Sequence, residues 1–321
     1  MENSNSHPII LITGGRGLLG SHVVPLLAKN DGVKVIVVTR GPAPASSPGS
    51  PVTTITGDLR DATLWERLPD TITHVVHLAA FIPWKPEDKN RARVVIDNLT
   101  PLAHLIEYSQ RWPHLAQVIY SSSVSVYAPS GKILTEDSPT LPPTLYGAAK
   151  LAGEQLLNCC EARNLATVSL RLSSLYASGQ YEGTVLPIMV NRAMQKQELL
   201  VFGDGARTQD FLHCEDAARA VLLCFQKQAR GTYNVGSGTA VTMFELAETV
   251  NRVCADGQVK IVQRPSSDND PGIRLDVSKA RRELDFHARF QLEEGLRHLQ
   301  HGTSGHRTEG SGEEGSATVQ Y

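Results

Sequence analysis

The sequence predicts an α/β fold, in which a doubly wound parallel sheet carries a smaller C-terminal lobe. A continuous, β-branched apolar run at 33–38 is typical of a strand that is buried on both faces of a parallel sheet, and further strand-like runs follow it, as at 73–78. Such runs alternate with segments of helical apolar spacing, for example 91–111, which indicates repeated βαβ units with helices on both faces. The third observation is a glycine-rich turn at 13–20, between the first apolar run and the first helix.

The predicted elements follow one another in a regular order. The apolar run at 9–12 is the first strand, and a helix over 21–27 follows it. The further strands are expected at 33–38, 52–56, 73–78, 116–120, 168–172 and 233–235. Two longer helices are expected over 91–111 and 146–162.

The glycine-rich turn reads Thr13-Gly14-Gly15-Arg16-Gly17-Leu18-Leu19-Gly20. Glycines at 14, 17 and 20 allow the backbone to turn sharply and to approach a pyrophosphate closely. The helix that follows points its free N–H groups and the positive end of its dipole at the phosphates. Because a strand precedes this turn and a helix follows it, residues 14–20 predict a Rossmann-type dinucleotide site.

The chain is expected to divide into three regions. Residues 8–176 form the dinucleotide-binding Rossmann domain, to which later sheet elements around 208–240 are added. Residues 177–207 and 241–300 form the substrate-binding lobe. The last segment, 301–321, consists largely of Gly, Ser, Glu and Thr without periodicity, and we expect it to be a disordered tail.

Composition excludes several classes of partner. The chain has 321 residues, of which 41% are hydrophobic and 20% charged, as in an ordinary globular protein. A net charge of −2 gives no electrostatic case for binding nucleic acid or an anionic membrane. No apolar run approaches the ~20 residues of a membrane span, and the polar segment Met1–His7 shows no secretory signal. We therefore expect a cytoplasmic protein whose partner is a small molecule.

The cysteines give no sign of a metal site. There are five of them, an odd number, and their spacing fits no common set of metal ligands. Reduced thiols in the cytoplasm explain this pattern most simply.

Three side chains form a candidate catalytic group. Tyr146 and Lys150 are four residues apart at the start of a helix and therefore share one face. A nearby ammonium lowers the pKa of a phenol, which is otherwise about 10. Ser123 lies at the carboxyl end of the fifth strand, where ligands bind in such sheets, and its hydroxyl is placed to hold a substrate oxygen against the tyrosine.

Several motifs occur in one order along the chain. They are the glycine-rich turn, Gly57-Asp58-Leu59-Arg60-Asp61, His77-Leu78-Ala79-Ala80, Ser121-Ser122-Ser123, the Tyr146/Lys150 pair, Arg171, Gly203-Asp204-Gly205, Asp210-Phe211-Leu212-His213, Tyr233-Asn234-Val235-Gly236-Ser237-Gly238 and Asp276-Val277-Ser278-Lys279-Ala280. Together they closely resemble the extended short-chain dehydrogenase/reductase family, the NAD-dependent epimerase/dehydratase group, over about residues 8 to 299.

The resemblance implies a role for each matching residue. Tyr146 is the general acid/base, Lys150 lowers its pKa and binds the nicotinamide ribose, and Ser123 orients the reacting group. Asn98 supports the proton relay, and Asp58 meets the adenine amino group. The full set expected to bind the cofactor is Gly14, Gly15, Arg16, Gly17, Leu18, Leu19, Gly20, Arg40, Asp58, Leu59, Leu78, Ala79, Ala80, Asn98, Tyr146 and Lys150. A homodimer, built from the helices that contain Asn98 and Tyr146, is also implied.

Two arginines favour NADP over NAD. NAD-binding relatives usually carry an acidic residue at the end of the second strand, where this chain has Thr39-Arg40. Arg16, inside the glycine-rich turn, resembles the basic residue found there in relatives that use NADP. Two guanidiniums match a 2′-phosphate well, so NADP is expected and NAD is the alternative.

The expected reaction is hydride transfer between NADP(H) and a carbonyl or secondary alcohol. Dehydratases of the family place Thr-Asp-Glu where this chain has Ser123-Val124-Ser125, which argues against elimination of water. The open alternatives are a nucleotide-sugar epimerase with tightly bound NAD, a catalytically silent cofactor-binding regulator, and a protein that uses the fold only for assembly.

The substrate site is the part that the sequence defines least. Ser122, Ser123, Trp84 and Arg207 are the candidate substrate-binding residues. Nucleotide-sugar relatives commonly show Gln-x-Arg-Asp after Gly-Asp-Gly, whereas this chain reads Arg-Thr-Gln-Asp at 207–210, with the arginine moved by two places. A nucleotide-sugar substrate is therefore less strongly indicated than the cofactor.

Overall fold

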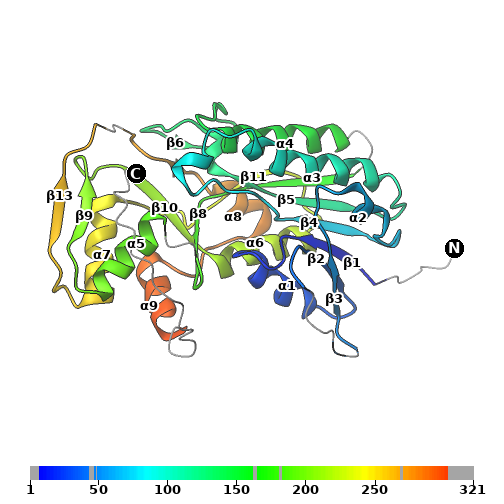
Figure 1. The fold of residues 1–321 in the computed structure, drawn as a ribbon, viewed down its shortest axis with the longest axis horizontal. Helices are drawn as coiled ribbons and strands as arrows, with labels where there is room; N and C mark the ends of the chain where they lie inside the picture. The colour runs from blue at the N-terminus through cyan, green and yellow to red at the C-terminus, as the bar shows by residue number, and fades with distance from the viewer. Residues whose placement is uncertain are drawn as a thin grey trace.

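A computed structural model of the chain describes residues 7–42, 47, 49–161, 165–180, 183–267 and 270–302. Its centre is a seven-stranded sheet in the order β11-β7-β5-β4-β1-β2-β3 (Figure 1). The strands of this sheet are β1 (Ile9–Thr13), β2 (Lys34–Thr39), β3 (Val52–Thr56), β4 (His74–His77), β5 (Gln117–Ser123), β7 (Ala166–Leu172) and β11 (Gly231–Val235). All neighbouring pairs are parallel, which confirms the predicted doubly wound α/β fold.

Helices cover both faces of this sheet (Figure 1). One layer consists of α1 (Gly20–Ala28), α6 (Cys214–Gln226) and α8 (Ser278–Leu284), and the other of α2 (Ala62–Glu66), α3 (Arg93–Ser109) and α4 (Leu145–Glu161). Alternate residues of β1 point to opposite layers, as the period of a strand requires. Ile10 and Ile12 pack into the core under α1 and α6, while Leu11 packs into the core under α3.

The smaller lobe lies at one end of the molecule, on the left of Figure 1. Its helices are α5 (Val185–Met194), α7 (Met243–Ala255) and α9 (Leu292–Gly302), and they share a separate hydrophobic core. The short strands pair in three small sheets, which are β8 (Ser174–Tyr176) with β10 (Thr208–His213) and β12 (Ala240–Thr242), β9 (Leu199–Phe202) with β13 (Ile261–Arg264), and β6 (Ile133–Leu134) with β14 (Arg274–Leu275). Two 3-10 turns, η1 (Pro86–Asp88) and η2 (Val124–Val126), complete the described elements.

The structure also bears on the predicted tail, on the cysteines and on the question of a membrane span. Most of the tail that was predicted to be disordered, residues 303–321, lies outside the described residues. All five cysteines are free thiols. Across the described ranges, no helix combines the length and the apolar character that crossing a membrane requires.

Candidate active site

The carboxyl ends of the parallel strands open into one cleft with a cavity volume of about 1110 Å³. This is the edge at which ligands bind in open α/β sheets. The turns after β1, β2 and β3 form one end of the cleft, and β8, β10 and the start of α5 form the other. The predicted site residues that line it are Gly14, Arg16, Gly17, Leu18, Leu19, Gly20, Arg40, Asp58, Leu59, Leu78, Ala79, Ala80, Trp84, Ser122, Ser123, Tyr146 and Lys150.

The glycine-rich turn is shaped to receive a pyrophosphate. Gly14 has a φ of +70°, and a Cβ added there would lie 2.7 Å from the backbone nitrogen of Ala79. A Cβ on Gly20 would collide with the Gly14 carbonyl oxygen, so the turn can be this tight only with glycine at both places. Helix α1 begins without a side-chain cap and without an acidic residue in its first turn, which leaves its positive end open to an anion. The residues therefore fit the pyrophosphate of a dinucleotide.

Gly15 is a predicted cofactor-binding residue that does not line the cleft. A Cβ on Gly15 would lie 2.8 Å from the side chain of Val37 on β2. The residue is buried, and it allows the turn to pack against the sheet. Gly15 thus allows close packing beneath the cleft, and its contact with the cofactor stays a prediction.

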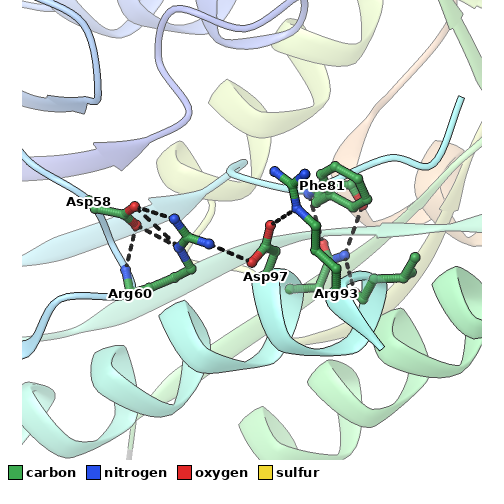
Figure 2. Close-up of polar contacts among 7 residues, drawn as sticks. Asp58, Arg60, Phe81, Arg93 and Asp97 are labelled. Atoms are coloured by element: carbon green, nitrogen blue, oxygen red, sulfur yellow. Dashed lines mark hydrogen bonds and ion pairs between the residues drawn. The ribbon is translucent and has the colours of Figure 1, made fainter. Parts of the chain in front are cut away.

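A series of paired charged side chains borders the end of the cleft near β3 (Figure 2). The Arg60 guanidinium bonds both carboxylate oxygens of Asp58, with a shortest distance of 2.6 Å, and lies 2.9 Å from Asp97. Asp97 also pairs with Arg93, which stands 4.5 Å from the ring centre of Phe81. The hydrogen bonds from Arg60 lower the pKa of Asp58 to about 2. Asp58 is thus a carboxylate held in place at the position expected for adenine recognition.

Arg16 and Arg40 lie on the same wall of the cleft. The Arg16 guanidinium donates a 3.0 Å hydrogen bond to the carbonyl oxygen of Pro42, which fixes it beside the end of β2. Both side chains are exposed, and both line the cavity. Thr39, Arg40 and Gly41, which also line this wall, carry no carboxylate.

Ser123, Tyr146 and Lys150 come together at the end of β5. The Ser123 hydroxyl donates a 3.1 Å hydrogen bond to the Ser125 hydroxyl and accepts one of 3.1 Å from the backbone N–H of Ser125. It also lies near enough to the Tyr146 phenol to lower the pKa of that group. The Lys150 ammonium donates a 2.6 Å hydrogen bond to the carbonyl oxygen of Ser121 and lies 5.7 Å from the ring centre of Tyr146. An alcohol or ketone at this place would meet both a hydroxyl and a phenol.

Burial shifts the pKa values of these groups. Burial raises the pKa of Tyr146 above its ordinary value, and the Ser123 hydroxyl offsets this in part. Burial lowers the pKa of Lys150 to about 7, against the opposing effect of Glu154. We expected Lys150 to lower the pKa of Tyr146, but in the protein without a cofactor the Tyr146 pKa is raised. Here Ser123 is the group that lowers it.

Asn98 lies behind the wall of the cleft. Its amide nitrogen donates to the carbonyl oxygens of Phe81, at 2.9 Å, and Val94, at 2.7 Å. Its amide oxygen accepts a 3.2 Å bond from the backbone N–H of Phe81. The side chain is 3% exposed and is not part of the cleft lining. Asn98 therefore holds the loop after β4, and its part in catalysis or cofactor binding stays a prediction.

The substrate end of the cleft combines apolar and neutral polar groups. Trp84 lines this end as predicted and is 43% exposed. Arg207 does not line the main cleft. It lies 3.1 Å from Asp270 in an adjoining cavity of about 160 Å³ and donates to the amide oxygen of Gln209. Gln209, two residues on, lines the cleft and donates a 2.7 Å hydrogen bond to Ser174, while substrate binding by Arg207 stays a prediction.

Sequence reasoning missed several residues of the site. Arg60 and Asp97 line the cleft, as do Ser174 and Gln209. A signal existed for Arg60, because it stands within the same motif as Asp58. Ser174 comes from a strand of three residues, which periodicity cannot reveal. Among the described residues, no group of three His, Cys, Asp or Glu side chains is placed to hold a metal ion.

Comparison with known proteins agrees with this geometry. The chain is 29% identical to a dTDP-glucose 4,6-dehydratase from Streptomyces niveus, over 89% of this chain and 90% of the relative. It superposes on a UDP-glucose 4-epimerase from Thermotoga maritima, crystallised with UDP-glucose, with a TM-score of 0.76 and 27% identity, covering 91% and 97% of the two chains. It also superposes on the Bordetella bronchiseptica enzyme WbmG in complex with NAD, with a TM-score of 0.77 and 25% identity, covering 94% and 95%.

The family of the chain is shown by a match to a family sequence profile. The sequence profile of the NAD-dependent epimerase/dehydratase family matches residues 10–236, which include the glycine-rich turn and the Ser123, Tyr146 and Lys150 group. With its parallel sheet and cleft, the chain belongs to this family, within the extended short-chain dehydrogenases/reductases.

Proposed function

We propose that this chain transfers hydride between a nicotinamide dinucleotide and a secondary alcohol or ketone carbon of a sugar-type substrate. The observation that carries the proposal is the meeting of Ser123, Tyr146 and Lys150 at one point of the cleft. The bound nicotinamide supplies or accepts the hydride. Tyr146 moves the proton of the reacting oxygen, and Ser123 holds that oxygen and lowers the pKa of Tyr146. We expect Lys150, as an ammonium, to favour the phenolate further once the cofactor is bound.

The family includes three outcomes of this chemistry, and the chain favours two of them. Val124 and Ser125 stand where dehydratases carry their carboxylic acids, so elimination of water lacks its acid and base. Arg16 and Arg40 support NADP and, with it, an exchangeable cofactor and a reductase. The similarity to UDP-glucose 4-epimerases and to an NAD complex supports the second candidate, an epimerase that retains NAD.

The first experiment identifies the cofactor. Purified protein is denatured, and any released nucleotide is separated and measured by its absorbance and mass. Retained NAD in near-stoichiometric amount supports the epimerase. Protein that is free of nucleotide and that oxidises added NADPH with a keto-sugar supports the reductase.

The second experiment tests the acid/base. Tyr146→Phe removes the phenolic hydroxyl and leaves the ring, so we expect turnover to fall by about 10²–10⁴-fold while cofactor affinity stays nearly unchanged. Steady-state turnover and a fluorescence titration with NADPH measure the two quantities. A variant that keeps more than about a tenth of the wild-type kcat would contradict the role of Tyr146.

A further inference from the structure

One face of α4 is joined to the end of β5 at three successive residues. Tyr146, Lys150 and Glu154 follow one another at intervals of four residues and therefore share that face. Lys150 donates to the backbone carbonyl of Ser121, and Glu154 accepts from the hydroxyl of Ser122. Tyr146 lies beside the hydroxyl of Ser123, which lowers its pKa. Two of these contacts belong to the reactive group already described, and the one made by Glu154 does not.

Glu154 also binds a neighbouring strand. Its carboxylate accepts hydrogen bonds from Arg171 of β7, at 3.0 Å and 3.3 Å from Nε and at 2.7 Å from Nη2. Arg171 is the register partner of Ser122, so both donors reach the carboxylate from adjacent strands. The exposed fractions of Glu154 and Arg171 are 1% and 6%. One buried carboxylate therefore ties α4 to both β5 and β7.

The packing between α4 and β5 is unusually close at this place. A Cβ added to Gly153 would lie 2.5 Å from the Tyr120 hydroxyl, so the helix touches the strand through a bare backbone. Such closeness buries the Lys150 ammonium, which is 2% exposed. A buried ammonium is costly unless an opposite charge is near, and Glu154 supplies that charge from one turn further along the helix.

We propose that Glu154 is a positioning residue for the reaction at Tyr146, an inference that rests on the function proposed above. Glu154 is not part of the cleft lining and acts through its neighbours. Its hydrogen bonds to Ser122 on β5 and Arg171 on β7 fix the end of β5, and with it Ser123, relative to the helix face that carries Tyr146. Its charge keeps Lys150 protonated where the reaction needs an ammonium.

The groups around Lys150 show why this charge matters. Glu154 and Tyr146 face it from α4, the Tyr120 ring lies 4.8 Å away on β5, and His77 faces it from β4. Burial lowers the pKa of His77 to about 3, so this ring is neutral and adds no charge. Glu154 is then the anion that holds the pKa of Lys150 up against burial.

The test measures Lys150 directly and needs no substrate. Protein labelled with ¹³C at the lysine ε-carbon is titrated by NMR, and Lys150→Met identifies the signal. Glu154→Gln keeps the shape of the side chain and removes its charge, so we expect the Lys150 pKa to fall by about one unit or more. Arg171→Gln removes the guanidinium that pairs with Glu154 and leaves Lys150 as the cation beside that carboxylate, so we expect the Lys150 pKa to rise. This variant gives a second readout if Glu154→Gln folds poorly.

A matched control separates charge from contact. Ser122→Ala removes a neutral partner of Glu154, and the Lys150 pKa should stay within a few tenths of its wild-type value. In turnover assays, the kcat of Glu154→Gln should begin to fall at a lower pH than the kcat of the wild type, because Lys150 loses its proton earlier. Relative to the wild type, the variant should lose about tenfold more kcat above the shifted pKa of Lys150 than below it. An unchanged Lys150 pKa in both charge variants would overturn the inference. Full turnover in Tyr146→Phe would instead overturn the proposed function.

Discussion

Arg40 is, with Arg16, the side chain on which the predicted preference for NADP depends. It stands at the end of β2 on the wall that also carries Arg16. A charge-assisted hydrogen bond to a 2′-phosphate contributes about 1.5–3 kcal/mol. We expect Arg40→Asp to weaken NADPH by at least roughly ten- to a hundred-fold and to leave NADH unchanged or tighter, because the new carboxylate repels the phosphate and accepts from the ribose hydroxyls.

Fluorescence titration of both reduced cofactors measures this change. The matched control is Lys34→Asp, which makes the same change of charge at the opposite end of β2, away from the cleft. Equal affinities of the wild type for NADPH and NADH, or the same ratio in Arg40→Asp, would show that these arginines are surface charges. The epimerase with retained NAD would then be the stronger candidate.

His77 makes the stability of the protein sensitive to acid. Burial lowers its pKa from 6.5 to about 3, and its Nδ1 lies 3.0 Å from the Thr13 hydroxyl. In this pH range the unfolded chain binds a proton that the folded protein excludes, so stability falls as pH drops from 6.5 toward 3. At pH 4 the loss from this residue is on the order of 3 kcal/mol.

His77→Asn removes this titration and keeps a polar group near Thr13. We expect the variant to lose less stability than the wild type between pH 7 and pH 4, whatever its stability at pH 7. Urea unfolding at the two pH values gives the comparison. Parallel losses in the two proteins would mean that His77 is protonated in the native state.

At the scale of single residues, the sequence predicted reactive groups better than supporting ones. Tyr146 and Lys150 were predictable because their spacing places them on one helix face. Asn98 was expected in the same site, yet both ends of its amide are used by the backbone of Phe81 and by Val94. Glu154 gave no signal, because its partner Arg171 lies on a strand and only the folded sheet brings the two together.

The contact between α4 and β5 is the element whose spacing matters most for the site. An alanine at position 153 would place a methyl group 2.5 Å from the Tyr120 hydroxyl. Inserting such a group into a packed contact costs about 1–3 kcal/mol. We expect Gly153→Ala to lower both the melting temperature and kcat, since Tyr146 and Lys150 stand on the helix that must move.

Calorimetry and turnover assays check this expectation. Asn158→Ala is the matched control, because it is an exposed position of the same helix and alanine favours helix there. A Gly153→Ala variant that melts at or above the wild-type temperature would show that the helix adapts without strain.

Elements of the central sheet were predictable, and those of the lobe were not. Each expected strand of the sheet is present, with ends shifted by at most three residues. Long apolar runs give a clear period, whereas the strands β6, β12 and β14 outside the central sheet are only two or three residues long. Their partners are far away along the chain, as in the pairing of Ile133 with Arg274, so tertiary contacts rather than local pattern decide them.

For the whole molecule, a bound dinucleotide should stabilise the fold, because the cleft gathers turns from both ends of the sheet. A ligand at about 100 times its dissociation constant adds about 2.7 kcal/mol of stability. We expect the preferred cofactor to raise the melting temperature by several degrees, at roughly 2–4 °C per kcal/mol. Differential scanning fluorimetry with NADPH, NADH and adenosine monophosphate compares the candidates, and no shift with either dinucleotide would contradict the binding site.

Quaternary structure remains a prediction of the family resemblance. The expected homodimer would use the outer faces of α3 and α4, where Ile96 and Leu156 are exposed. Size-exclusion chromatography with light scattering measures the mass of the particle. Charged residues at both positions should produce a monomer if these helices form the interface.

The place of β11 affects how the chain folds while it is being made. Six strands of the central sheet are complete once Leu172 has been translated, but the strand that covers β7 is Gly231–Val235. The ribosome synthesises α5, β9, β10 and α6 in the meantime. All seven residues of β7 are buried in the finished protein, and until β11 arrives this strand is an open edge that can pair with another nascent chain. The need for chaperones should therefore be greatest in this interval of translation.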